Sequence, residues 1–444
     1  MALPHFGVVP GCVYYPSNRQ RLSGKMTSHR ARQKWGWALY DWANSAFSTT
    51  VMAGFFPVFF KEYWNTGLDV TESTFRLGVA NSVASLVIVL VAPVLGAIAD
   101  SMNRRKGMLF AFAFVGIVMT GGLYLVGRGE WLMATFLYVG AIIGFSGSNV
   151  FYDSLLPFVA DEQELDRTSA LGFSLGYLGG GILLALNVLM TIHPDWFGIA
   201  DATAAVRFSF LLVAIWWLAF SMPLLTLVEE PVNGAATGRV SVIREGFSRV
   251  WHTLHEVRAL RNVWLFLVAY WLYIDGVDTI VRMAVDYGLS LGFDRNSLIM
   301  ALLITQFVGF PSALAFGWIG SRYGTKTGIL IGLAVYILVT VRASLMDSAA
   351  EFYTLAFMIG LAQGGVQALS RSMYARMVPA GRTAEFFGFY NMLGKFAAVL
   401  GPVLMGWVGV VTNSSRTGIL SLLLLFVSGA VVLLFVKQGQ NARK

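Results

Sequence analysis

Residues 96–107, GAIADSMNRRKG, and residues 317–328, GWIGSRYGTKTG, decide the fold because they repeat one pattern. Both begin and end with glycine, both have isoleucine at the third position, and both have a basic residue at the tenth. Each lies between the second and the third of six long apolar segments. The chain therefore contains two copies of a six-segment unit, and an internal duplication of this kind is typical of alternating-access transporters.

The apolar segments around the two repeats are each about 20 residues long, which is the length of helix that crosses a bilayer core of about 30 Å. Only a helix or a closed barrel satisfies its own backbone in lipid. We therefore predict an all-α integral membrane protein with twelve transmembrane helices in two six-helix bundles. The predicted spans are residues 36–60, 75–99, 107–127, 131–157, 169–191 and 206–228 in the first bundle, and 262–287, 297–320, 327–346, 352–376, 385–410 and 417–436 in the second.

The composition excludes several other classes of protein. Of the 444 residues, 56% are hydrophobic and 13% are charged, whereas a soluble domain has about 25% charged residues. The single cysteine is Cys12, and all five histidines lie outside the predicted spans: His5, His29, His193, His252 and His255. A membrane-embedded enzyme that uses imidazole or thiol groups is therefore disfavoured. We expect no cofactor and no metal.

The basic residues are distributed unequally between the two sides of the membrane. Of the 32 lysines and arginines, 23 fall on the side of the chain termini, 8 fall on the other side, and Lys395 falls within a span. By the positive-inside rule, this asymmetry predicts cytoplasmic termini and a multi-pass protein of the cell membrane. It also accounts for the net charge of +8 without a nucleic-acid partner. The predicted cytoplasmic tails are residues 1–35 and 437–444, and the first of them lacks the apolar core of a cleaved signal peptide.

A charged segment, residues 229–261, joins the predicted bundles 36–228 and 262–436. Apolar residues recur in it at helical spacing beside arginines, which predicts a basic amphipathic helix on the inner membrane surface. A role as a tether between the halves is the simpler interpretation.

The first repeat resembles the signature loop of the major facilitator superfamily, in which a glycine, an aspartate and a basic cluster join the second and third helices. Gly96, Asp100 and Arg104, with Arg105 and Lys106, carry this resemblance. Two departures are Asn103, where the pattern has a second glycine, and Ser321, where the second repeat lacks the aspartate. Three blocks further resemble the vacuole effluxer-like branch, related to fungal vacuolar amino acid effluxers: WALYDWANS at 37–45, FYDSLLP at 151–157 with GYLGG at 176–180, and the run from 364 to 401.

Charged residues inside the bilayer cost roughly 2.5 to 3.5 kcal/mol each, so they need partners or a wet cavity. Lys395 lies near the midplane of the eleventh predicted helix, one turn after Asn391 on the same face. Asp275 lies at a similar depth in the seventh helix. We predict an Asp275–Lys395 ion pair that faces the central cavity, with a purely structural pair as the alternative. Asp278 is expected to pair with Arg282 one turn further on.

Three polar stripes follow helices that line the cavity in the resembled superfamily. They are Asp41 and Asn44 on the first helix, Asn149 and Asp153 on the fourth, and Gln363, Gln367 and Arg371 on the tenth. We predict a gate in which Asp41 or Asp153 pairs with Arg371 when the inner side is closed. The alternative is that Arg371 extends to the interface and Asp41 caps local backbone.

The pair Asp100 and Arg104 is expected to couple the motions of the two halves rather than to contact cargo. Arg105 and Lys106 are expected to be simple positive-inside anchors. Crowded glycines in the fifth helix, such as Gly172 and Gly176, are explained by close helix packing.

These features predict secondary active transport of a small polar solute by alternating access. The branch resemblance makes amino acids, moved outward, the first candidates, and protons are a candidate coupling ion through Asp41 or Asp275, although a uniporter would show the same residues. Two other classes stay open: a transporter-derived sensor or scaffold without flux, and a membrane-embedded enzyme. A small-molecule substrate and the lipid bilayer are the expected partners of a monomeric chain.

Overall fold

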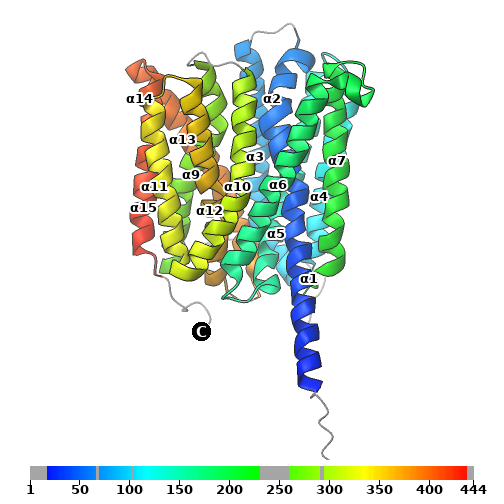
Figure 1. Ribbon diagram of the computed structural model, residues 1–444, viewed down its shortest axis with the longest axis vertical. Coiled ribbons are helices and arrows are strands. Elements are labelled where there is room, and N and C mark those ends of the chain that lie inside the picture. Colours follow the sequence, from blue (N-terminus) through cyan, green and yellow to red (C-terminus); the bar gives the residue numbers. More distant parts are fainter. Residues whose placement is uncertain are drawn as a thin grey trace, which may run out of the picture.

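The computed structural model describes residues 18–66, 70–102, 104–230, 260–290, 295–379 and 381–437. Within these ranges every regular element is a helix, and the helices run side by side as one bundle (Figure 1). The first half contains α1 (Asn18–Ala46), η1 (Phe47–Phe55), α2 (Phe56–Phe59), η2 (Phe60–Trp64), α3 (Val70–Met102), α4 (Arg105–Gly122), η3 (Leu123–Leu125), α5 (Trp131–Val159), α6 (Leu165–Ile192), η4 (Pro194–Phe197) and α7 (Ala202–Leu227). The second half contains α9 (Arg261–Ser290), α10 (Arg295–Tyr323), α11 (Thr325–Ser344), α12 (Ala349–Met377), α13 (Thr383–Thr412), α14 (Ser415–Leu420) and α15 (Leu423–Phe435).

Each of the twelve predicted spans coincides with helical chain in the structure. The described residues contain 10 helices that are long and apolar enough to cross a membrane. The other two predicted spans correspond to the stretch from α1 to η2 and to α13, of which Leu400–Thr412 counts as a shorter apolar helix. The fold is thus an all-helical membrane bundle. The predicted amphipathic helix at 229–261 lies almost wholly outside the described residues.

The first span differs from a regular α-helix, which the sequence did not predict. η1 and η2 are π-helical, with the Phe56 amide bonded to the Val51 carbonyl and the Asn65 amide bonded to the Phe60 carbonyl. Pro57 contributes to this change because it has no N–H to give to the helical ladder. Short π-helical stretches often occur at functional sites, and η1 borders the central cavity.

A lysine of each sequence repeat caps the end of the last helix in its own half. Lys106 donates from its Nζ atom to the carbonyl oxygens of Leu225 and Val228 at the end of α7. Lys326 donates in the same way to Leu434 and Val436 at the end of α15. A lysine at the C-terminal end of a helix satisfies its last carbonyls and complements its dipole. Lys106 therefore holds the end of α7 in addition to any role as a positive-inside anchor.

The halves meet along two seams related by an approximate two-fold axis: α3 packs against α13, and α6 packs against α10. The first glycine of each repeat lies at one seam. A Cβ at Gly96 would lie 2.2 Å from the Ala384 carbonyl oxygen, and a Cβ at Gly317 would lie 2.5 Å from the Ala170 Cβ. Both glycines are therefore needed for the close approach of the two halves.

The outer surface carries large apolar side chains, such as Leu125 and Val410, which are 76% and 81% exposed. Such a surface is stable in lipid rather than in water. The start of α1 and the end of α15 lie at the same end of the bundle, which we call the terminal end (Figure 1). The loop between α11 and α12 and the start of α14 lie at the opposite end.

Candidate functional site

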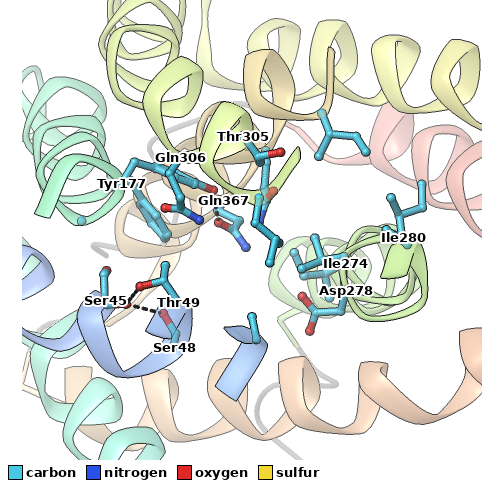
Figure 2. Close-up of a pocket in the computed structure, with 18 of the residues that line it drawn as sticks. Ser45, Ser48, Thr49, Tyr177, Ile274, Asp278, Ile280, Thr305, Gln306 and Gln367 are labelled. Carbon is cyan, nitrogen blue, oxygen red and sulfur yellow. Dashed lines mark hydrogen bonds between the residues drawn. The ribbon is translucent and has the colours of Figure 1, made fainter. Parts of the chain in front are cut away.

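A cavity of about 420 Å³ lies between the two halves. Its lining comes from α1, η1, α5 and α6 of the first half and from α9 to α13 of the second, with a contribution from α14. It extends from Arg371 on α12 to Met346 and Ile419, which lie at the end of the bundle opposite the termini. Figure 2 shows the part where Ser45, Ser48 and Thr49 face side chains of the second half.

Arg371 forms the floor of this cavity and is 2% exposed. Its guanidinium donates to Asp41 Oδ2 at 3.3 Å and to Asp153 Oδ1 at 3.1 Å. It also donates to the hydroxyl and the carbonyl oxygen of Ser169 at 2.9 and 2.8 Å. One buried cation from the second half is thus held by two carboxylates and a backbone carbonyl from the first. The alternative in which Arg371 extends to the membrane interface is wrong.

Aromatic rings complete the surroundings of the guanidinium. The centroids of Trp37, Phe173 and Tyr152 lie 4.8, 4.2 and 5.3 Å from the central carbon of Arg371. Tyr152 also donates its hydroxyl to Asp41 Oδ2 at 2.8 Å. Rings at these distances attract a cation, and together they exclude water from the ion network. Trp37 and Tyr152 belong to two of the sequence blocks on which the branch resemblance depends.

The other polar residues predicted near this floor contact one another across helices. Asn44 donates to Asn149 at 2.6 Å, and Asn391 on α13 donates to Asp153 Oδ2 at 3.1 Å. Gly172 leaves the space that the network occupies, because a Cβ there would lie 2.6 Å from Asp41 Oδ2.

Asp153 and Arg371 occupy equivalent positions in the two halves. The helices α5 and α12 both have 29 residues, and each residue lies 22 positions after the start of its helix, at Trp131 and at Ala349. Matching places in these two helices therefore carry opposite charges.

A second polar cluster lies closer to the terminal end, and sequence reasoning missed it. Asp166 at the start of α6 is 1% exposed. It accepts hydrogen bonds from Arg376 at 2.8 and 2.9 Å, from Thr325 at 3.1 Å, and from Ser372. The sequence contained one sign of this cluster, which is that a second arginine, Arg376, follows Arg371 on α12. The two arginines lie more than one helical turn apart, so they reach different depths of the bundle.

Asp100 pairs with Arg105 and not with Arg104, which corrects the prediction. Arg105 is completely buried, with its Nη2 atom 2.6 Å from Asp100 Oδ1, whereas Arg104 is exposed before α4 begins. The carboxylate also accepts from the amides of Ala384 and Glu385 at 3.1 and 2.8 Å. Asp100 therefore caps the N-terminus of α13 from the other half, where the helix dipole favours a negative charge.

Asp275 does not line the cavity, contrary to prediction. It is completely buried between α9 and α13, where it accepts from the Gly401 amide at 2.9 Å and from Thr279 at 3.4 Å. The reason is local: Gly401 has no side chain, so the carboxylate approaches the α13 backbone directly. The predicted partner Lys395 has its side chain outside the described residues, as does Arg282, the expected partner of Asp278. Asp278 itself lines the cavity.

The second half supplies amide groups to the cavity. The predicted residues Gln363 and Gln367 line it, and so does Gln306 on α10, which was not predicted (Figure 2). Tyr177 from α6 donates its hydroxyl to Gln367 Oε1 at 3.3 Å. Among the described residues, no three His, Cys, Asp or Glu side chains gather into a group that could hold a metal ion.

The described polar contacts between the halves gather toward the terminal end. Arg371, Asp166 and Asp100 each join one half to the other there, while the cavity continues to the opposite end. The structure thus represents a state that is closed on the terminal side.

Comparisons with known proteins agree with this architecture. The family model described as vacuole effluxer Atg22 like matches residues 65–444. A Bacillus subtilis (strain 168) protein described as an uncharacterized MFS-type transporter, YxiO, is 36% identical over 416 residues, covering 93% of this chain and 96% of the relative. Autophagy-related protein 22 of Eremothecium gossypii is 22% identical over 472 residues, covering 90% of each chain.

Solved structures show the same fold. The proton:xylose symporter XylE superposes with a TM-score of 0.69 at 14% identity, covering 94% of this chain and 96% of XylE. FucP in its outward conformation gives 0.63 at 12% identity, covering 92% and 99%. Both belong to the major facilitator superfamily, whose members are transporters rather than enzymes. The chain is therefore a multi-pass membrane protein that belongs to the vacuole effluxer Atg22-like family of the major facilitator superfamily.

Proposed function

We propose that the protein is a secondary active transporter that moves a small polar solute through the central cavity by alternating access. The observation that carries this proposal is the cavity itself, which the buried Arg371 network closes on one side and which extends to the other end of the bundle. Rocking of the two halves would break the contacts of Arg371 with Asp41 and Asp153 and open the terminal side.

The cavity lining supports a solute that has both polar and apolar parts. Hydroxyl and amide groups come from residues such as Ser48, Thr305 and Gln306, and apolar side chains such as Ile274 and Leu355 lie beside them. Amino acids fit this lining, and the Atg22 relatives belong to a family described as vacuole effluxers. Efflux is the direction we propose, with the basic terminal end in the cytoplasm.

Proton coupling is part of the proposal because two carboxylates share one cation at the cavity floor. A proton on Asp41 or Asp153 would weaken its contact with Arg371 and favour opening of the terminal side. Asp275 is a less suitable carrier, since it does not line the cavity.

The test is solute flux in liposomes that contain the purified protein. The probe is a ¹⁴C-labelled mixture of L-amino acids, offered with and without an imposed pH gradient. We expect uptake above that of protein-free liposomes, and stimulation by the gradient if protons are coupled. Liposomes with the Arg371→Met variant serve as the matched control and should show only the background rate.

Two results would overturn parts of this proposal. Absence of flux for amino acids and for a wider panel of small polar metabolites would favour a sensor or scaffold. Equal flux in the wild type and in Arg371→Met would show that the ion network has no part in the cycle.

A further inference from the structure

Tyr177 of α6 is inserted into the opposite half of the molecule. Its ring lies between α10 and α12, and the residue is 7% exposed. A Cβ at Gly309 would lie 2.7 Å from the ring's Cδ1 atom, and a Cβ at Gly364 would lie 2.7 Å from its Cε2 atom. These atoms are on opposite edges of the ring. The two glycines, one from each helix, therefore form a slot that fits this ring.

The slot aims the tyrosine hydroxyl at Gln367. The hydroxyl donates to Gln367 Oε1 at 3.3 Å, and both residues line the cavity (Figure 2). A glutamine amide has one oxygen that accepts and one NH₂ group that donates. Because the oxygen is engaged by Tyr177, the NH₂ group is the part that remains for a molecule in the cavity.

The nearby cation is already occupied in this state. Arg371, one turn further along the same face of α12, is held by Asp41, by Asp153 and by the Ser169 carbonyl. An anionic group that enters from the open side therefore meets the Gln367 amide before it reaches a guanidinium whose donors are taken.

We infer that Tyr177 is a positioning residue that fixes the Gln367 amide with its N–H donors toward the cavity, so that this subsite takes a carboxylate of the solute. The inference rests on the proposed function, because it assigns one end of an amino acid to one place in the transport cavity. This arrangement also explains why the subsite would prefer a carboxylate to an alcohol. A carboxylate only accepts hydrogen bonds and so matches the N–H donors, whereas an alcohol also has a hydrogen that needs an acceptor.

The variant that tests this is Tyr177→Phe, which removes the hydroxyl and keeps a ring in the glycine slot. The control is Tyr336→Phe. Tyr336 is completely buried, it stacks on Phe426 at 5.3 Å, and it is absent from the cavity lining. Both substitutions remove one oxygen from a tyrosine, but the Tyr177 hydroxyl bonds Gln367 at the cavity, whereas the Tyr336 hydroxyl has no hydrogen-bond partner among the described residues.

Two quantities are measured in liposomes with the ¹⁴C-labelled L-amino acid mixture: the half-saturating concentration and the maximal rate. We expect Tyr177→Phe to raise the half-saturating concentration about three- to tenfold, the effect of losing the one ordinary hydrogen bond that fixes the amide. The maximal rate should stay within about twofold, because the ring still fills the slot. Tyr336→Phe should change neither quantity.

Competition by unlabelled compounds gives a readout that a purely structural role would not move. The competitors are L-amino acids and the matching amino alcohols, in which CH₂OH replaces the carboxylate. In the wild type the acids should compete better. In Tyr177→Phe the amide is free to turn its oxygen outward, so the preference for acids over alcohols should fall by a similar three- to tenfold factor.

Thermal stabilisation of the detergent-purified protein by the same amino acids separates this inference from the proposed function. If the amino acids stabilise the wild type, stabilise Tyr177→Phe less and show no flux in liposomes, the subsite is supported and transport is contradicted. Flux with unchanged half-saturation and unchanged acid preference in Tyr177→Phe would overturn the inference alone. A lower maximal rate with unchanged half-saturation would also overturn it, and absence of both stabilisation and flux would contradict the two together.

Discussion

At the scale of single residues, the molecule depends on one arginine shared by two carboxylates. Arg371 is buried with Asp41 and Asp153, and among the described residues no other charged side chain contacts the guanidinium. Removing one member of such a buried set leaves the remaining charges uncompensated, which costs more than the pair contributes when it is intact.

Replacement of Arg371 with methionine is therefore expected to lower the free energy of unfolding by about 3 to 5 kcal/mol. The measurement is thermal unfolding in detergent. Asp41→Asn and Asp153→Asn added to Arg371→Met remove the unpaired charges, so the triple variant should recover most of the stability while remaining inactive in transport. A triple variant no more stable than Arg371→Met would show that lost packing, and not charge, causes the effect.

Gly172 allows a second prediction, because the network occupies the space where a side chain would be. A Cβ there would lie 2.6 Å from Asp41 Oδ2 and 2.8 Å from the Tyr152 hydroxyl oxygen. Gly172→Ala should therefore displace Asp41 and reduce flux at least about tenfold, corresponding to ~1.4 kcal/mol or more. Gly78→Ala is the control, since a Cβ at Gly78 meets no atom within 4 Å; equal effects of the two changes would contradict this account.

The sequence allowed prediction of which residues meet at the floor but not of every partner. Charges at helical spacing inside apolar segments identified Asp41, Asp153 and Arg371, because lipid penalises any charge without a partner. The choice between Arg104 and Arg105 was wrong, since adjacent residues at a helix start point in different directions and their order alone does not show which one turns inward. Asp166 was missed because it lies before the predicted span 169–191, where lipid does not penalise a charge, and Tyr177 was missed because an uncharged side chain gives no such signal.

At the scale of elements, each repeat joins its own half to the other through a helix end. Asp100 on α3 caps the first amides of α13. At the equivalent position in the second repeat, Ser321 accepts from the exposed Arg167 side chain at 3.2 Å and donates to the Trp318 carbonyl of its own helix at 2.9 Å. The two seams are alike in backbone packing but differ in their polar contacts. The helical course of the predicted spans was predictable from hydropathy, and 10 helices of the described residues are long and apolar enough to cross a membrane. The π-helical course of η1 depends on local backbone bonding that composition does not reveal.

Asp100→Asn should shift the protein toward states that are open on the terminal side. Asparagine keeps the shape but loses one of two backbone acceptors and the charge that pairs with Arg105, a cost of ~1 kcal/mol or about fivefold in population. Distances between spin labels on α3 and α13 measure this shift. Ser321→Ala should change the same distribution less than about twofold, and an equal response of the two variants would contradict the assignment of closure to Asp100.

At the scale of the whole molecule, the structure predicts different solvent access from the two ends. In a Cys12→Ser background, Ser48→Cys lines the cavity and Ser372→Cys is completely buried on the terminal side of Arg371. A membrane-impermeant maleimide should label Ser48→Cys from the side opposite the termini and leave Ser372→Cys unlabelled. Adding Asp41→Asn should increase labelling of Ser372→Cys from the terminal side; unchanged labelling would show that Asp41 does not hold this side closed.

The equivalent positions of Asp153 and Arg371 have a consequence for the ancestry of the chain. In a dimer of two identical six-helix subunits, residues at this position would face each other across the axis as two aspartates or two arginines, and the like charges would repel in a medium of low dielectric constant. The present attraction requires the two copies to differ. Because the two halves belong to one polypeptide and differ in sequence, the chain has a contact that a symmetric assembly is unable to build.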